Sequence, residues 1–159
     1  MKRTTIAVLS LLMMIVVNAS ASDKTPASNA FEKMKSMAGK WQGKTEIMTL
    51  SVVSQGSALM QADEHESMVT MFHLDRDRLM MTHYCAAQNQ PRMTGQVRPD
   101  GSIEFRFLDA TNLTSPTMGR MNRMILTMKD SDHIEEQWFF ADDGKTEGKG
   151  ETFVYTRVK

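Results

Sequence analysis

The polar side chains with the greatest chemical potential lie near the middle of the chain, in Thr82-His83-Tyr84-Cys85 and the loop that follows. This run resembles the end of a β-strand. Since side chains two residues apart on a strand share a face, His83 and Cys85 point to one side and Tyr84 to the other. A Cys/His pair can act as nucleophile and base, but the sequence shows neither an orienting acid nor an oxyanion hole beside it. We therefore favour a non-enzymatic protein, with hydrolase or isomerase chemistry at His83 and Cys85 as an alternative.

The same region offers hydrogen-bonding groups that a binding protein could use, because functional groups often lie on loops held by a rigid scaffold. One interpretation is structural, with a satisfied hydrogen bond at His83 and a loop pinned by Asn89 and Gln90. In the other interpretation these groups orient a bound molecule. The candidate ligand-binding residues are then His83, Tyr84, Asn89, Gln90 and Arg92.

Asp63-Glu64-His65-Glu66 places four potential metal ligands in a row. On a strand they divide between two faces, Asp63 with His65 and Glu64 with Glu66, so at most two could meet one ion locally. A zinc site usually needs three or four converging ligands. A solvated, charged strand end is the favoured interpretation, and no metal site or cofactor is assigned.

Methionine is unusually frequent, with 16 residues in the whole chain. Soft thioethers can bind Cu(I). Most of these methionines, however, lie within strand-like runs rather than in one loop. Since methionine is flexible and polarisable, this distribution favours a role in the core or in the lining of an adaptable cavity.

Length and charge narrow the possible functions. The chain has 159 residues, which suits one domain, and it balances 19 basic against 19 acidic residues. Nucleic-acid binding requires clustered Lys and Arg, and no such block is present, so nucleic acid is not an expected partner.

Residues 1–21 have the pattern of a secretory signal peptide. Lys2 and Arg3 supply the positive start, residues 4–17 supply a short apolar stretch, and Ala19-Ser20-Ala21 matches a small-residue cleavage site. The apolar stretch is shorter than the roughly 20 residues that a membrane span needs. We expect cleavage near Ala21 and a periplasmic or secreted mature protein without an integral membrane span. The sequence leaves the oligomeric state open.

The mature chain is predicted to begin with a flexible leader, residues 22–29, followed by a short helix over residues 30–38. Asn29 and Glu32 have the spacing of a capping box. Gly39 is well placed to end the helix. The apolar face at helical spacing consists of Phe31, Met34, Met37 and Ala38.

After Gly39 the hydrophobic pattern has a period of two, which indicates β-strands. Pro99-Asp100-Gly101 and Asp142-Asp143-Gly144 are hairpin signals, because glycine accepts the positive φ of such turns. About nine strands in a domain of residues 30–159 favour an all-β, antiparallel barrel, since closure removes exposed edges. A β-sandwich is the competing architecture. The predicted strands are residues 41–53, 58–66, 68–74, 78–85, 92–98, 102–108, 120–128, 133–141 and 151–158.

Two sites at the ends of this domain resemble the calycin superfamily of lipocalins, fatty-acid-binding proteins and nitrobindin-like barrels. Gly39-Lys40-Trp41 is similar to the G-x-W signature, and Arg157 takes the place of the basic residue that packs over that tryptophan from the last strand. The resemblance implies that Trp41 and Arg157 close the barrel through a cation–π contact of about 0.5–2 kcal/mol. Residues 75–93 and 105–116 resemble an uncharacterised group of secreted bacterial calycin-like proteins, which implies a fold rather than an activity.

The sequence therefore predicts a secreted calycin-like β-barrel with a short N-terminal helix, whose partner is a small, mainly hydrophobic molecule. Barrels of about this size either hold one small ligand or fill themselves with side chains. One alternative is a periplasmic protein that binds haem or copper through His83 and methionine side chains. Another is an envelope protein-interaction module that uses the outer surface of the sheet.

Overall fold

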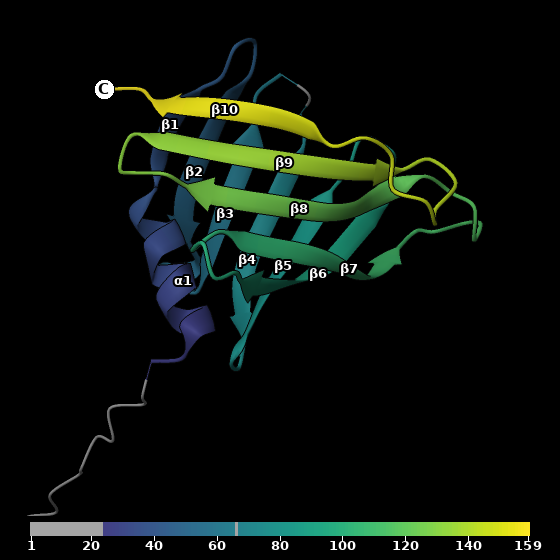
Figure 1. The fold of residues 1–159 in the computed structure, drawn as a ribbon, viewed down its shortest axis with the longest axis horizontal. Helices are drawn as coiled ribbons and strands as arrows, with labels where there is room; N and C mark the ends of the chain where they lie inside the picture. The colour runs from purple at the N-terminus through teal and green to yellow at the C-terminus, as the bar shows by residue number, and fades with distance from the viewer. Residues whose placement is uncertain (1–23, 66) are drawn as a thin grey trace, which may run out of the picture.

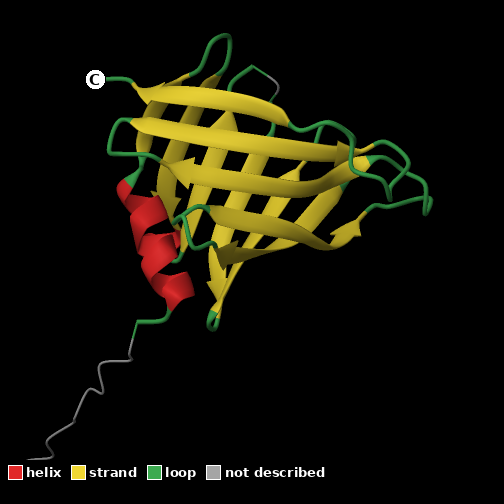
Figure 2. Ribbon diagram, viewed as in Figure 1, coloured by secondary structure: helices red, strands yellow, loops and turns green. Residues whose placement is uncertain are grey.

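The alternating residues after Gly39 fold as strands in the computed structural model, which describes residues 24–65 and 67–159. Each strand pairs antiparallel with its neighbours along the chain, and the first pairs with the last, so the sheet closes on itself (Figures 1 and 2). The predicted antiparallel barrel is confirmed and the sandwich is excluded. The strands are β1 (Gly39–Gln42), β2 (Ile47–Val53), β3 (Ala58–Asp63), β4 (Val69–Asp75), β5 (Arg78–Tyr84), β6 (Gln90–Val97), β7 (Ile103–Thr111), β8 (Arg120–Met128), β9 (His133–Ala141) and β10 (Glu151–Arg157).

The described residues form ten strands rather than nine, because the predicted first strand, residues 41–53, is two strands. A tight turn separates them, in which the Gly43 N–H donates to the Glu46 carbonyl oxygen at 2.9 Å. Gly43 lacks the Asn-Gly or Asp-Gly signal of a hairpin and is needed for close approach instead. A Cβ at this position would lie 3.1 Å from the ring of Tyr155. The turn therefore depends on a contact with the last strand, which the local sequence does not show.

Barrel closure brings Trp41 of β1 opposite Arg157 of β10. The guanidinium lies 4.3 Å from the indole ring, and it donates to the carbonyl oxygens of Ala38 at 2.9 Å and Ser131 at 2.7 Å. Trp41 is fully buried. A Cβ at Gly39 would lie 2.7 Å from Arg157 Nη1, so only glycine leaves room for the guanidinium at this place. The glycine and the tryptophan of the G-x-W sequence thus both contact the same arginine.

The helix α1 (Pro26–Ser36) begins four residues earlier than predicted. Thr25 is its N-cap, with Oγ1 accepting from the Ser28 N–H at 3.1 Å, so the predicted capping box at Asn29 is wrong. Pro26 occupies the first helical position, where its fixed φ favours a helix and its missing N–H has no consequence. Residues 26–29, assigned to the leader, therefore form the first turn. The predicted signal peptide and the start of the leader lie outside the described residues.

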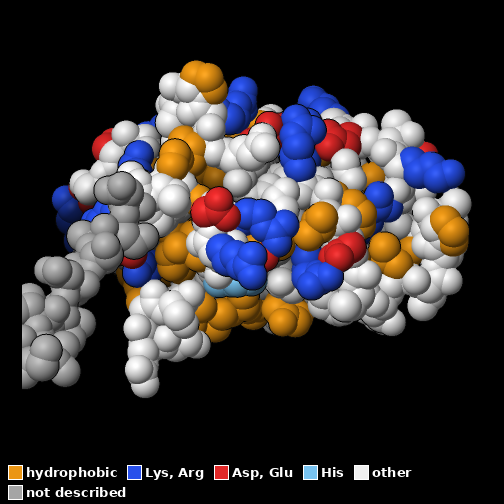
Figure 3. Space-filling view, turned by 90° about the horizontal axis from the view of Figure 1, so that it is seen from below, with side chains coloured by type: hydrophobic (Ala, Val, Ile, Leu, Met, Phe, Trp, Pro, Cys, Tyr) orange, Lys and Arg blue, Asp and Glu red, His pale blue; other side chains and the backbone are white. Residues whose placement is uncertain are grey.

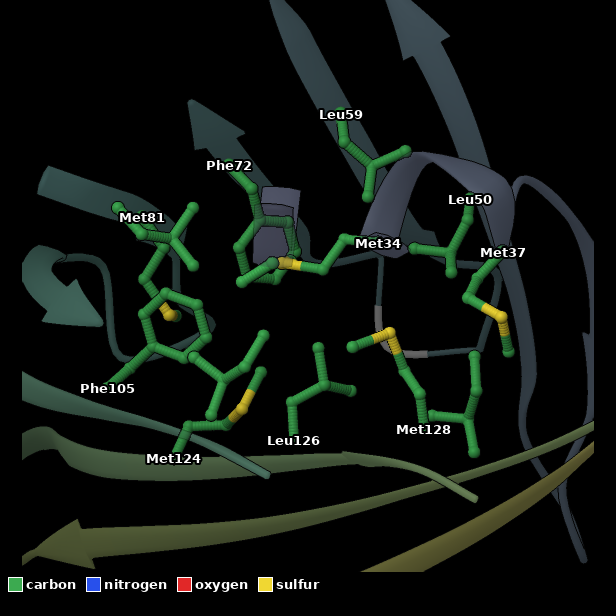
Figure 4. Close-up of a cluster of buried hydrophobic side chains, with 14 of the residues drawn as sticks. Met34, Met37, Leu50, Leu59, Phe72, Met81, Phe105, Met124, Leu126 and Met128 are labelled. Carbon is green, nitrogen blue, oxygen red and sulfur yellow. The ribbon is translucent and has the colours of Figure 1, made fainter. Parts of the chain in front are cut away.

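The helix α1 lies against one end of the barrel (Figure 1). Side chains of the helix and of the strands fill the barrel at this end. Figure 4 shows Met34 of α1 and Met37, which follows the helix, among side chains from the strands, including Leu50, Leu126 and Met128. The space that remains there has a volume of about 10 Å³, which is enough for one water molecule at most. In the part of the chain that the structure describes, no helix has the length and apolar character to cross a bilayer.

The outer surface carries charges of both signs, and Figure 3 shows Lys or Arg side chains beside Asp or Glu on one face. Several of these charges pair across neighbouring strands. Arg123 of β8, for example, lies 3.4 Å from Glu104 of β7, and it also lies 2.7 Å from Glu147 in the loop between β9 and β10. Such pairing leaves little single-sign potential on this part of the surface.

Replacing Arg157 with alanine should destabilise the barrel. The change removes one cation–π contact and two hydrogen bonds, which together contribute about 2–3 kcal/mol. Urea unfolding of Arg157→Ala, followed by tryptophan fluorescence, measures the change in the free energy of unfolding.

The matched control is Arg106→Ala, because Arg106 is 62% exposed and forms a surface ion pair with Glu104. Its free energy of unfolding should change by no more than about 0.5 kcal/mol. Equal effects of the two substitutions would show that the contact with Trp41 does not stabilise closure.

Candidate functional site

A cavity of about 150 Å³ lies inside the barrel at the end opposite α1. Its rim includes Glu46 from the turn between β1 and β2 and Lys149 from the loop between β9 and β10. The inner wall is formed by inward-facing residues of the strands. This end of the barrel therefore contains a cavity, whereas the end next to α1 is filled with packed side chains.

Four aromatic residues form one wall of the cavity, and they come from two neighbouring strands. The period of two in β9 and β10 directs them inward, since alternate side chains point to opposite faces of a sheet. Phe153 and Tyr155, two residues apart on β10, also stack on each other, with 6.5 Å between ring centroids. These aromatic residues are Trp138, Phe140, Phe153 and Tyr155.

Met121 of β8 reaches the cavity because of a β-bulge. The pairing of β8 with β9 shifts between Met121 and Arg123. A bulge inserts one extra residue and reverses the side-chain alternation on one side of it. Met121 therefore lines the cavity, although simple alternation from the buried Met124 would point it outward.

A buried carboxyl group lines the cavity, that of Glu136, which is 2% exposed. Its Oε2 accepts from Gln61 Nε2 at 3.1 Å and from Trp138 Nε1 at 2.9 Å. Burial raises the pKa of Glu136, the two hydrogen bonds oppose that rise, and the charge of Asp63 adds to it. No hydrogen bond within the described residues involves Oε1, which leaves this oxygen for a bound molecule.

His83 is the second buried titratable group of the cavity. Its Nδ1 and the hydroxyl of Thr70 are 2.8 Å apart, and its ring lies 4.8 Å from that of Trp138. Burial lowers the pKa of His83 from 6.5 to about 4, so the imidazole is neutral at pH 7. Its Nε2 is buried and has no hydrogen-bond partner among the described residues. Trp138 thus links the histidine and the carboxyl through its ring face and its indole N–H.

Of the five residues proposed from sequence to bind a ligand, His83 alone lines the cavity. Tyr84 is 50% exposed, and Arg92 forms an exposed ion pair with Asp109, with Nε and Oδ1 2.6 Å apart. Asn89 connects two loops, and Gln90 pairs across the neighbouring strands β6 and β7. Asn89 Nδ2 donates to the Gly119 carbonyl at 2.9 Å, and Gln90 Oε1 accepts from the Thr111 hydroxyl at 2.7 Å.

Sequence reasoning overlooked Glu136, Gln61 and Trp138 as a group. Glu136 lies between Ile134 and Trp138 in the alternation of β9, and a carboxylate at an inward position of an apolar strand is a recognisable signal. Gln61 gives no such signal, since its contact with Glu136 joins residues 75 positions apart.

Within residues 24–65 and 67–159, no three His, Cys, Asp or Glu side chains converge as a metal site would require. Glu66, one member of the acidic run considered above, lies outside these residues. No known family model and no curated protein matches this chain. The function is therefore argued from the cavity itself.

The buried neutral state of His83 predicts a loss of stability in weak acid. The unfolded chain takes up a proton near pH 6.5 while the folded protein does so only near pH 4. Stability therefore falls as the pH decreases through this window, by on the order of 3 kcal/mol in total. Urea unfolding of the wild type and of His83→Gln, at intervals between pH 7 and pH 4, measures the difference.

The variant should lose less stability than the wild type over this range, because glutamine takes up no proton. Effects of Glu136 are common to both proteins and cancel in the comparison. The control is His65→Gln, since His65 is exposed and its replacement should leave the wild-type profile unchanged. Parallel profiles for the wild type and His83→Gln would contradict the prediction.

Proposed function

We propose that this protein is a secreted, calycin-like barrel that binds one small, mainly apolar molecule and catalyses no reaction. The observation that carries the proposal is the lined cavity at one end of a barrel whose other end is filled. Ligand sites are typically concave and mostly apolar, with a few polar groups that fix orientation. The aromatic wall supplies the apolar surface, and Glu136, Gln61 and His83 supply the polar groups.

The size of the cavity limits the ligand to about one ring. A cavity of about 150 Å³ in another protein is just large enough to take up benzene. Burial of about 150 Å² of apolar ligand surface would contribute about 4 kcal/mol. That free energy corresponds to a dissociation constant near 1 mM, before hydrogen bonds or charges contribute. A haem, with four linked pyrrole rings, requires considerably more space.

Copper binding is the second candidate, because His83 lines the cavity together with the thioether residues Met68 and Met121. Imidazole and thioether groups are ligands that suit Cu(I). The Thr70 hydroxyl at Nδ1 would fix the orientation of such an imidazole, as partners of metal-bound histidines do. Retention of Cu(I) through dialysis by the wild type, and its loss in His83→Ala, would favour this candidate over an apolar ligand.

Blocking the cavity should abolish binding of a one-ring probe. Benzyl alcohol, added to protein with ¹³C-labelled methionine methyl groups, should shift the signals of Met68 and Met121 in a saturable manner. The signals of Met34 and Met81, in the filled part of the barrel, should not move. Met121→Trp should weaken binding at least tenfold, because the indole would occupy the space.

The matched control is Met60→Trp. Met60 lies between the inward-facing Leu59 and Gln61 of β3 and therefore points outward. This variant should bind benzyl alcohol like the wild type. A probe that shifts no cavity methionine, or that binds Met121→Trp normally, would count against the proposal.

The proposed export can be tested independently of the ligand. In a Gram-negative host, the mature protein should appear in the periplasm. Its mass, measured by mass spectrometry, should be that of a chain whose first residue is Ser22. Ala21→Lys should block cleavage and leave the full-length chain, since signal peptidase requires a small residue there. A wild-type protein that stays cytoplasmic at full length would refute the export.

A further inference from the structure

The charges around the cavity are strongly biased toward one sign. Four of its lining residues carry a carboxyl group and one carries an ammonium group, although the whole chain balances 19 acidic against 19 basic residues. Because three of the carboxyl groups come from the rim, the potential there attracts cations. The carboxyl residues are Glu46, Asp63, Glu136 and Glu151, and the ammonium residue is Lys149.

The aromatic wall adds a second attraction for positive charge. A cation over the face of an aromatic ring gains about 0.5–1 kcal/mol at an exposed site and about 2 kcal/mol when desolvated. Elsewhere this protein covers ring faces with its own cations, as Arg123 covers Phe139 at 3.6 Å and Arg120 covers Phe107 at 4.1 Å. Within the described residues, no such contact involves Trp138 or Phe153. The Trp138 ring already packs against His83, 4.8 Å away, so the ring of Phe153 is the more open surface for a bound cation.

Glu136 places a carboxyl group at the inner end of the cavity. Its Oε2 holds two hydrogen bonds, whereas Oε1 has none among the described residues. Burial disfavours the ionised form of a carboxyl that lacks an opposite charge, and a bound cation would supply that charge. A divalent metal ion held by carboxylate or imidazole ligands is not supported, because no three His, Cys, Asp or Glu side chains of the described part converge on one point.

From this combination we infer that the ligand of the proposed binding site is a small organic cation, either an amine or a quaternary ammonium ion. Its charged group lies between the aromatic wall and the carboxyl of Glu136, and its apolar remainder fills the rest of the cavity. This inference rests on the proposed function and specifies the chemical class of the ligand. Aromatic surfaces combined with carboxylates are the surroundings in which proteins bind quaternary ammonium groups.

The test compares three one-ring probes of nearly equal size that differ in charge: benzylammonium, benzyl alcohol and benzoate. Titrations followed by the Met68 and Met121 methyl signals give each dissociation constant. Benzylammonium should bind at least tenfold more tightly than benzyl alcohol, and benzoate should bind more weakly than either. Raising the salt concentration from 50 to 500 mM should weaken benzylammonium binding and leave benzyl alcohol unaffected, since salt screens the rim charges.

Glu136→Gln should reduce benzylammonium affinity about tenfold and change benzyl alcohol affinity less than threefold. The matched control is Glu135→Gln, because Glu135 is the neighbouring residue of β9 and pairs at the surface with Lys129, 2.5 Å away. If Glu136→Gln does not fold, Phe153→Leu provides the test, since leucine keeps the apolar volume and removes the ring face. This variant should bring the affinities of benzylammonium and benzyl alcohol closer together.

The outcomes separate the inference from the function on which it rests. Equal affinities for benzylammonium and benzyl alcohol, or tighter binding of benzoate, would overturn the cation inference and leave the apolar binding site intact. Failure of all three probes to shift the cavity methionines would overturn both. Selective benzylammonium binding that is equally strong in Glu135→Gln and weaker in Glu136→Gln would support both.

Discussion

The contact between the first and last strands is the constraint on which the rest of the structure depends. β1 is only four residues long, and it meets β10 where Trp41 lies opposite Arg157. Without this pairing the sheet would have two open edges, and the inward residues of β9 and β10 would face solvent. Arg157 supports closure because its guanidinium, on the last strand, contacts the Trp41 indole and the Ala38 carbonyl at the start of the barrel and the Ser131 carbonyl in the turn before β9, so that it joins three segments distant in sequence.

The closed barrel has two ends, which differ in how tightly side chains fill them. At one end the side chains of α1 interdigitate with aliphatic and methionine side chains of the strands, so that almost no space is left. At the other end, aromatic rings and hydrogen-bonded polar groups line a cavity that they do not fill. Glu136 lies at the boundary between the two, where it borders both the cavity and the small space below the helix. The burial of this carboxyl gives the inner end of the cavity its chemical character.

Hydrophobic alternation and turn residues predicted strands and turns well wherever the conformation of a segment depends on its own residues. The strands from β7 to β10 were anticipated from alternation, and the turns at Gly101 and Gly144 have the positive φ that their sequences require. The misjudged elements depended on less conspicuous signals. Pro26 in a polar segment suggests a leader, but proline also favours the first turn of a helix. Gly43 was read as part of a strand, because its close approach to Tyr155 appears only when the barrel is closed.

The sequence by itself determined the class of fold, since a period of two with frequent turn signals permits little except an antiparallel sheet. It also determined which residues of β9 and β10 share a face of the sheet. Only the tertiary structure decided which of these residues form a site. The hydrogen bond between Gln61 and Glu136 and the bulge that directs Met121 inward arise from pairing between strands. Such contacts depend on the register of distant segments, and register is a property of the closed barrel rather than of any single strand.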